Sequence, residues 1–147
     1  MITSPEINLV FPAYSYKVKK NEGKLYIFEE ISKKYRLLTP EEWVRQHCIH
    51  YLVNDLKYPA SLFQIEGGMM VDKLNRRTDI RIYTSTGEVF MLIECKAPHV
   101  VLKLETLQQI CQYQKTQKAE YLVITNGLQN IILHHSTKTI NDFPPYL

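Results

Sequence analysis

The sequence predicts an α/β fold of the α+β type, in which elements in the order αβββαβ build a mixed sheet after an N-terminal β-hairpin. One observation behind this is a helix start near residue 39 that is followed by three short strand-like runs. The other is a second helical pattern that leads from the third run to a continuous apolar strand at 120–125. A helix that joins two neighbouring strands of one sheet makes them parallel with a right-handed crossover, so the sheet should be mixed.

Length and composition predict one compact domain. The 147 residues suffice for a single core, and the net charge of +3 permits a polyanionic partner without requiring one. No apolar run approaches membrane-spanning length and the first residues lack signal-peptide features, so we expect a cytoplasmic protein with no membrane partner. Cys48, Cys95 and Cys111 are odd in number and stand in apolar contexts, which favours reduced core thiols.

Residues 1–38 are expected to form an N-terminal hairpin extension packed on the main domain, which spans 39–147. Strands at 14–20 and 24–28 would be joined by the turn at 21–23. Lysines alternate with tyrosines through this region, and such a surface can grip a phosphate backbone and stack on bases. The alternative is a solvated hairpin whose lysines discourage edge pairing.

The first helix has a well-defined start. Thr39 is predicted as the N-cap, Pro40 as the first helical residue and Glu42 as the partner that completes a capping box, with the helix running to about residue 56. Glu41 falls on the inward side with the apolar stripe, and Glu42 falls roughly opposite. Glu41 is therefore the better candidate for an inward-facing acid. Stabilisation of the helix dipole explains an acidic residue in the first helical turn equally well.

A strand at 61–66 precedes a hairpin that brings functional side chains together. Alternation along the strand sends Glu94 and Lys96 to one face and Cys95 to the other. If residues 86 and 87 form the turn, Asp79 lies directly opposite Glu94; if 85 and 86 do, Asp79 faces Leu92 on the same side. A three-residue loop would reverse that parity.

Two carboxylates that face each other across strands destabilise a sheet, and a divalent cation would remove the conflict. A small set of oxygen ligands with room for water suits Mg²⁺ or Mn²⁺ better than zinc. Lys96 would then lie beside a metal-bound water and the reacting phosphate. The alternative is an ordinary Glu/Lys pair on a solvated strand end.

Elements after this hairpin are a helix over 104–118, the strand at 120–125 and a last strand at 130–135. His134 and His135 are neighbours on that last strand, so we expect them to face opposite ways and not to form a metal pair. His47 and His50 are expected at the surface or rim of the first helix, and Trp43 in packing. The tail at 143–146 is expected to be an ordered or docking extension.

The segments 77–80 and 92–98, which carry Asp79, Glu94 and Lys96, resemble the N-terminal nuclease domain of type I restriction enzyme R subunits, in the PD-(D/E)XK nuclease superfamily. Residues 39–45 and 122–127 add to a resemblance that covers about 39–125. Gln109 and Tyr113 fit the QxxxY signature of RecB-type members, one turn apart on the helix after the ExK strand.

The resemblance implies a restriction-endonuclease-like core and a Mg²⁺-dependent deoxyribonuclease. Asp79 and Glu94 would hold the metal with the Cys95 backbone carbonyl, and Lys96 would be the catalytic amine. Glu41 would be the helix acid, with Gln109 and Tyr113 as accessory or DNA-binding residues.

The resemblance also bears on partners. In type I enzymes this domain is joined to an ATP-driven DNA motor, so DNA and other restriction-modification or motor subunits are the expected partners. A single site would require two copies for double-strand cleavage, which makes a homodimer a further expectation. The alternatives are a nuclease-fold DNA-binding module that is inactive without partner subunits, and a protein-interaction subunit with a structural carboxylate cluster.

Overall fold

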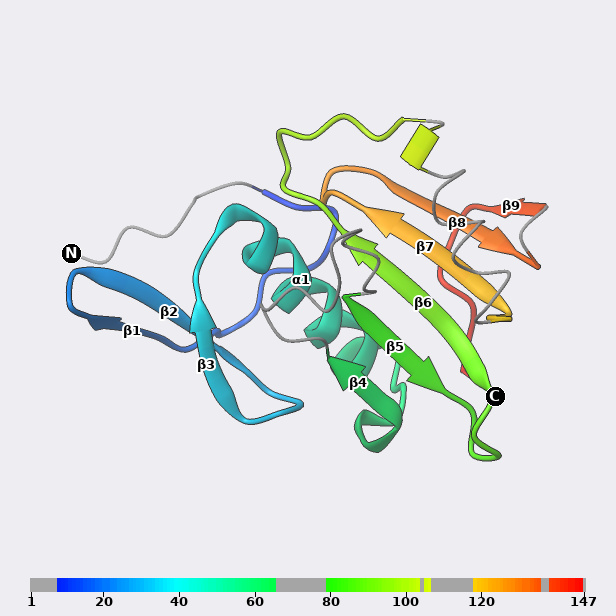
Figure 1. Ribbon diagram of the computed structural model, residues 1–147, viewed down its shortest axis with the longest axis horizontal. Coiled ribbons are helices and arrows are strands. Elements are labelled where there is room, and N and C mark those ends of the chain that lie inside the picture. Colours follow the sequence, from blue (N-terminus) through cyan, green and yellow to red (C-terminus); the bar gives the residue numbers. More distant parts are fainter. Residues whose placement is uncertain (1–7, 66–78, 104, 107–117, 136–137, 147) are drawn as a thin grey trace, which may run out of the picture.

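The computed structural model describes residues 8–65, 79–103, 105–106, 118–135 and 138–146, and within them the protein is a mixed α/β structure with two sheets (Figure 1). The larger sheet has the strand order β4-β5-β6-β7-β8-β9. Its strands are β4 (Phe63–Ile65), β5 (Ile80–Tyr83), β6 (Val89–Cys95), β7 (Tyr121–Thr125), β8 (Asn130–His134) and β9 (Lys138–Ile140).

Strand directions in this sheet follow the predicted connections. β6 and β7 are parallel, with Met91 beside Tyr121 and Cys95 beside Thr125, whereas the other neighbouring pairs are antiparallel. The mixed sheet is thereby confirmed. The helix predicted over 104–118 falls almost entirely outside the described residues, as do Gln109, Cys111 and Tyr113.

The N-terminal extension is a three-stranded sheet and not the predicted hairpin. Its strands are β1 (Val18–Asn21), β2 (Lys24–Glu29) and β3 (Lys34–Leu37), in that order. The third strand was missed because its four residues are mostly charged or exposed. It is held by tertiary contacts, since the fully buried Glu29 carboxylate accepts from the Arg36 guanidinium at 3.0 Å.

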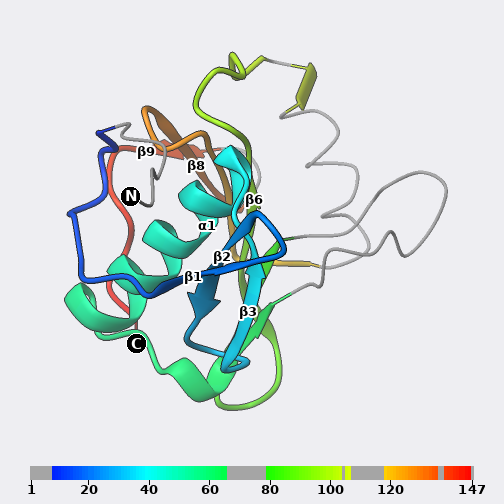
Figure 2. The ribbon, with the colours of Figure 1, turned by 90° about the vertical axis from the view of Figure 1, so that its left-hand side faces the viewer.

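The helix α1 (Pro40–His50) begins where the sequence predicts. The Thr39 side chain accepts a hydrogen bond from the Glu42 backbone N–H at 3.0 Å, and a π-helical segment, Tyr51–Asp55, continues the helix nearly to the predicted end. Val44, Cys48 and Leu52 are fully buried against the sheet. Figures 1 and 2 show α1 on one face of the six-stranded sheet, with the segment that follows β6 passing over the end of the sheet.

The β5–β6 hairpin reaches the first of the two alignments that the sequence left open, with Asp79 opposite Glu94, but by an unexpected route. Thr84 N–H donates to the Glu88 carbonyl at 2.7 Å, which closes a three-residue loop over 85–87. That loop alone would reverse the parity, but Phe90 is an extra residue on β6, because Tyr83 pairs with Val89 and Ile82 with Met91. The bulge restores the register, so Ile80 lies opposite Ile93 and Asp79 comes opposite Glu94.

The C-terminal tail is ordered and docks on the core, as expected. The Tyr146 hydroxyl donates to the Tyr83 carbonyl at 2.9 Å, the Tyr58 hydroxyl donates to the Pro144 carbonyl, and the Phe143 ring contacts Phe11. Strand β9, which precedes the tail, was not predicted. Its three residues carry too little pattern to be recognised without their partner β8.

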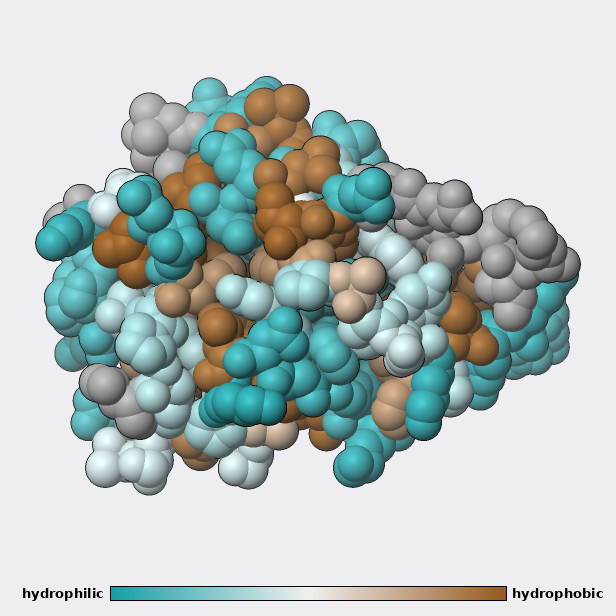
Figure 3. All heavy atoms as spheres, turned by 180° about the vertical axis from the view of Figure 1, so that it is seen from behind, coloured by the Kyte–Doolittle hydropathy of each residue, from teal (hydrophilic) through white to brown (hydrophobic). Residues whose placement is uncertain are grey.

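The core lies between α1 and the six-stranded sheet. Residues of alternate parity on β6, among them Met91, Ile93 and Cys95, face α1, while Leu92 packs on the opposite side with Ala119 and Leu122. Seen from behind, the surface mixes apolar with polar side chains (Figure 3). Among the described residues, no helix is long and apolar enough to cross a membrane.

Candidate active site

Asp79 is fixed at the start of β5 by a bond from the neighbouring strand. Its carboxylate accepts a hydrogen bond from the Cys95 backbone N–H at 2.7 Å, and the residue is only 5% exposed. The bond ties the carboxylate of one strand to the backbone of the next, which limits its rotation. Asp79 is thus positioned by the sheet itself.

Glu94 and Lys96 project together from the end of β6. The Lys96 ammonium lies 3.8 Å from a Glu94 carboxylate oxygen, and the side chains of Lys96 and Glu94 are 35% and 25% exposed respectively. Backbone pairing extends past the strand, since Lys96 N–H donates to the Thr125 carbonyl at 2.8 Å. An ammonium, a partly exposed carboxylate and a buried carboxylate therefore share one corner of the sheet.

The two carboxyl groups share a hydrogen bond, and this alters their acidity. Burial and then the negative charge of Asp79 raise the pKa of Glu94 to about 8, and only part of this is offset by Lys96. Burial also raises the pKa of Asp79, against the Cys95 N–H bond and the Arg45 charge, which lower it. The raised pKa values favour a shared proton on the pair, because two adjacent negative charges are unfavourable where one carboxylate is buried and the other is only partly exposed.

The first turn of α1 contributes Glu41 from a separate element. The residue is exposed overall, yet its pKa is raised, first by partial desolvation of its carboxyl group and then by the negative charge of Asp79, with Lys96 lowering it. Its titration is therefore coupled to the strand residues. The next residue, Glu42, is also acidic but makes different contacts.

Glu42 is engaged along the helix. Its carboxylate oxygens accept hydrogen bonds from Arg45 at 2.8 Å and from Gln46 at 2.7 Å. Arg45 and Gln46 are both buried, at 5% and 2% exposure. These contacts make Glu42 part of a helix-side network, and they leave Glu41 as the acid whose pKa responds to Asp79.

Arg45 was not singled out from the sequence, although it bears on the site. Its positive charge lowers the pKa of Asp79, and the bond and charge of Glu42 raise its own pKa against the effect of burial. The signal that could have identified it is the i,i+3 spacing of Glu42 and Arg45 at a helix start. A buried arginine so placed stabilises negative charge on the neighbouring strand.

Cys95 lies between Glu94 and Lys96 in the sequence, but its side chain faces the core on the opposite side of β6. Its thiol is fully buried in the main core and shares a hydrogen bond with Cys48, which raises the pKa of the Cys95 thiol. Both are free cysteines. A thiol so held is a packing group, so any role of Cys95 toward a metal would have to involve its backbone.

The loop after Lys96 is tied to the turn after β7. The Asn126 side-chain amide donates to the Val100 carbonyl at 2.9 Å, and its oxygen accepts from the backbone N–H groups of Leu128 and Gln129. This network was not predicted, although an Asn-Gly pair after an apolar strand is a typical turn signal. It holds the chain that leaves the candidate site against the end of the neighbouring strand.

The prediction that His47 lies at the surface is wrong. His47 is 4% exposed, its Nδ1 lies 2.8 Å from the Trp43 carbonyl, and its ring lies 4.3 Å from the Trp43 ring. Tyr14, from the N-terminal segment, covers this helix face and stacks on His50 at 4.1 Å. Helical periodicity could not reveal this second contact face because it is created by a distant segment. Trp43 is buried, as expected for a packing residue.

The expectation that His134 and His135 face opposite ways is also wrong. His135 has a φ of 53°, outside the extended region, and its ring lies 4.1 Å from that of His134. Period-2 alternation applies only while the backbone stays extended. β8 ends at His134, and the turn in the backbone brings both imidazoles to one side.

The donor set at Asp79 and Glu94 has the chemistry of a hard cation site. Two carboxyl groups lie together, one of them buried. Their raised pKa values favour a proton on the pair at a pH at which two ordinary carboxyl groups would both be charged. A divalent cation would relieve the same repulsion that the proton relieves. The residues present therefore fit Mg²⁺ or Mn²⁺. Gln109 and Tyr113, the predicted accessory residues, lie outside the described residues.

Comparison with known families gives a match that spans these residues. A family model described as Type I restriction enzyme R protein N terminus matches residues 40–144, well over half of the chain and the whole region from α1 to the C-terminal tail. A search of curated proteins gives no match. The matched region contains Glu41, Asp79, Glu94 and Lys96. The chain belongs to the family of type I restriction enzyme R protein N termini.

Proposed function

We propose that this protein is a PD-(D/E)XK-type nuclease domain that hydrolyses DNA phosphodiester bonds with Mg²⁺ or Mn²⁺. The observation that carries the proposal is the position of the Asp79 carboxylate opposite Glu94, with the Lys96 ammonium 3.8 Å from Glu94. Two carboxylates held together at a partly buried corner destabilise the fold, and strongly shifted pKa values concentrate at functional sites. Membership of a restriction-enzyme family supports DNA as the substrate.

In this proposal Asp79 and Glu94 hold the cation, together with the backbone carbonyl of Cys95. When bound, the cation supplies positive charge to the phosphate and lowers the pKa of a bound water. The chain contributes rigidity, because the Cys95 N–H fixes Asp79 and the hairpin register fixes Glu94. A hard cation suits oxygen ligands of this kind.

Lys96 and Glu41 would act on the reacting groups. The ammonium of Lys96 is partly exposed and lies within 3.8 Å of Glu94, so it can donate hydrogen bonds to a phosphate oxygen or orient the attacking water. Partial desolvation of the Glu41 carboxyl group and the negative charge of Asp79 raise the pKa of Glu41, which would make it a better proton acceptor than an ordinary glutamate.

Cleavage of supercoiled plasmid in Mg²⁺ or Mn²⁺ tests this assignment. We expect Asp79→Asn, Glu94→Gln and Lys96→Met each to reduce the nicking rate by about 100-fold or more, the scale of losing one electrostatic group at a reacting centre. Glu88→Gln, at an exposed residue directly after the hairpin loop, is the matched control and should nick at the wild-type rate. Undiminished nicking by the Asp79 and Lys96 variants would reject the site.

A second candidate function is a DNA-binding module that needs partner subunits for cleavage. The observation that favours it is the basic N-terminal sheet, where Lys19 lies over the Tyr35 ring at 4.3 Å and Lys17 over Phe28 at 5.5 Å. Such a module would retard DNA in EDTA, with affinity that falls steeply as salt rises. Retardation without nicking, in wild type and Lys96→Met alike, would favour this candidate over the isolated nuclease.

Partners follow from the same family. The family is named for a type I restriction enzyme, so other restriction-modification or motor subunits are the proposed protein partners. A homodimer would supply the second site needed for double-strand cleavage. Reconstitution with those subunits would test whether nicking depends on them.

A further inference from the structure

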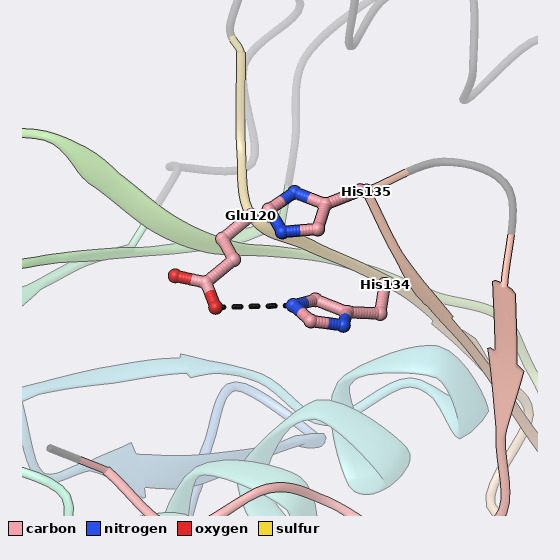
Figure 4. A group of neighbouring side chains, drawn as sticks. All are labelled: Glu120, His134 and His135. Atoms are coloured by element: carbon pink, nitrogen blue, oxygen red, sulfur yellow. Dashed lines mark hydrogen bonds and ion pairs between the residues drawn. The ribbon is translucent and has the colours of Figure 1, made fainter.

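We propose that Glu120, His134 and His135 form a binding site for a first-row transition cation of the zinc class, at the end of the sheet opposite the carboxylate pair. Among the described residues, these three offer one ligand atom each, and the atoms all lie within 4.8 Å of one another (Figure 4). The site is independent of the proposed nuclease function. It differs from that site in position, in ligand type and in the cation it would select.

The backbone brings the three residues together. Glu120 directly precedes β7 and His134 ends β8, and these strands are antiparallel neighbours with Tyr121 opposite His134. The His135 N–H donates to the Glu120 carbonyl at 2.8 Å, which continues the ladder by one pair. The positive φ of His135 then turns its imidazole toward the His134 ring.

Ring stacking orders the central ligand before any cation arrives. His134 stacks on Tyr121 at 4.5 Å with an interplanar angle of 12°, and on His135 at 4.1 Å with an angle of 28°. Its Nε2 lies 3.1 Å from a Glu120 carboxylate oxygen. A ring held on both faces loses little further conformational entropy on binding, which favours affinity.

The ligand set selects the class of metal. Two imidazole nitrogens and one carboxylate, with remaining positions open to solvent, match the composition of three-ligand zinc sites. Imidazole suits Zn²⁺, Co²⁺, Ni²⁺ and Cu²⁺, whereas Mg²⁺ prefers oxygen ligands and retains its waters. The Glu120 side chain is 36% exposed and His135 is also exposed, so these two can close the remaining distance by small rotamer changes while His134 stays in place.

The two sites are well separated along the sheet. In the β6–β7 register Glu94 lies beside Ile124, four residues beyond Glu120 along β7. At the usual rise of a strand this places the two centres roughly 13 Å or more apart. A cation at Glu120 therefore does not share ligands with Asp79 or Glu94.

A simpler interpretation is that Glu120 and His134 form only an ion pair, with His135 resting against it. Lys138 pairs with His134 across β8 and β9, and its positive charge opposes cation binding. The two interpretations differ in a measurable way. An ion pair needs only Glu120 and His134, whereas a metal site also needs His135.

Calorimetric titration of the metal-free, reduced full chain with ZnCl₂ tests the proposal. We expect one zinc per chain with micromolar or tighter affinity, and His135→Ala and Glu120→Gln should each weaken it by about 10-fold or more, since even indirect ligand partners contribute roughly 10- to 100-fold. His99→Ala, at an exposed loop histidine, is the matched control and should bind like wild type. Glu94→Gln should also retain this zinc.

Co²⁺ gives a second readout that does not depend on heat signals. Binding by nitrogen and oxygen ligands should produce visible d–d absorption without a thiolate charge-transfer band, and His135→Ala should remove that absorption. Absence of zinc binding, equal affinity in wild type and His135→Ala, or equal loss in His99→Ala would each overturn the proposal. A thiolate band that persists in His135→Ala would likewise assign the metal to cysteine and overturn it.

Discussion

At the level of single residues, opposing electrostatic effects act on the two carboxyl groups of the candidate active site. Asp79 is buried and bonded to a backbone N–H, Glu94 is placed opposite it, and Lys96 offsets only part of the repulsion. The result is a carboxyl group that keeps its proton near neutral pH. A protein domain gains nothing in stability from such a pair, which is why the pair is informative about function.

The raised pKa of Glu94 predicts how stability depends on pH in the metal-free protein. Folded Glu94 keeps its proton up to about pH 8, while the unfolded chain loses it near the ordinary glutamate pKa of 4.5. Between those values the folded state binds more protons than the unfolded state, so the free energy of unfolding falls as pH rises. We expect a loss of roughly 2 kcal/mol after allowing for partial solvent screening.

Urea denaturation in EDTA at pH 5, 6.5 and 8 measures this. Glu94→Gln should flatten the decline because the amide does not titrate, and Glu88→Gln should leave it as in wild type. Saturating Mg²⁺ should stabilise the wild type more at pH 8 than at pH 5, because the cation needs deprotonated ligands. An equal decline in wild type and Glu94→Gln would mean that another group carries the pH dependence.

Helical periodicity at this scale narrowed the helix acid to Glu41 or Glu42. The helical wheel favoured Glu41 weakly, because a first-turn acid also serves the helix dipole. The structure adds what the wheel lacks: the carboxylate of Glu42 already binds Arg45 and Gln46, whereas the pKa of Glu41 responds to Asp79.

At the element scale, the β5–β6 hairpin shows how two irregularities compensate. A three-residue loop would have sent Asp79 and Glu94 to opposite faces, and the extra residue Phe90 reverses that parity a second time. The sequence contains no clear signal for the bulge. Phe90 occupies it because its ring packs against Tyr58 and Tyr121, which come from other elements.

The turn after β7 gives a prediction about packing. Gly127 has a φ of 82°, and a β-carbon there would lie 2.6 Å from Leu9 Cδ2 and 3.1 Å from Val44 Cγ2. Gly87 has a similar φ of 89°, but a β-carbon added there would meet nothing within 4 Å, so it is a matched control for backbone strain alone. We expect Gly87→Ala to cost about 1 kcal/mol in unfolding free energy.

Gly127→Ala should cost ~1–3 kcal/mol more than Gly87→Ala, because overpacking adds to the strain. Chemical denaturation of both variants measures the difference. Leu9→Ala in the Gly127→Ala background should recover part of it, since the Leu9 side chain is the nearest obstacle. Equal losses of unfolding free energy in the two glycine variants would show that Leu9 does not pack closely against the turn at Gly127.

At the scale of the whole molecule, the two ends of the described chain brace the central sheet. Leu9 and Phe11 pack near α1, and Val10 N–H donates to the Gly127 carbonyl at 2.7 Å. From the other end, Tyr146 reaches Tyr83 on β5, next to the hairpin that carries the candidate site. The sheet is thus stabilised by segments that are distant in sequence.

Tyr146 allows this bracing to be measured. Tyr146→Phe removes the hydroxyl bond to the Tyr83 carbonyl and should cost about 1 kcal/mol. Tyr146→Ala also removes ring contacts with Phe90 at 5.0 Å and Tyr58 at 5.6 Å, and should cost about 2 kcal/mol or more. Tyr35→Phe, on the exposed edge of the N-terminal sheet, should be neutral. Thermal unfolding that is equal in Tyr146→Ala and wild type would show that the tail is not docked in solution.

Local patterns were enough to predict the helix start at Thr39, the strand segments next to Asp79 and Glu94, and the side of β6 from which Glu94 and Lys96 project. These depend on capping and on periods of 3.6 and 2 residues, which act over a few neighbours. The bulge at Phe90, strands β3 and β9, the burial of His47 and the convergence of His134 with His135 became apparent only in the folded structure. The physical reason is that each of these depends on contacts between segments far apart in the chain, which no local pattern records.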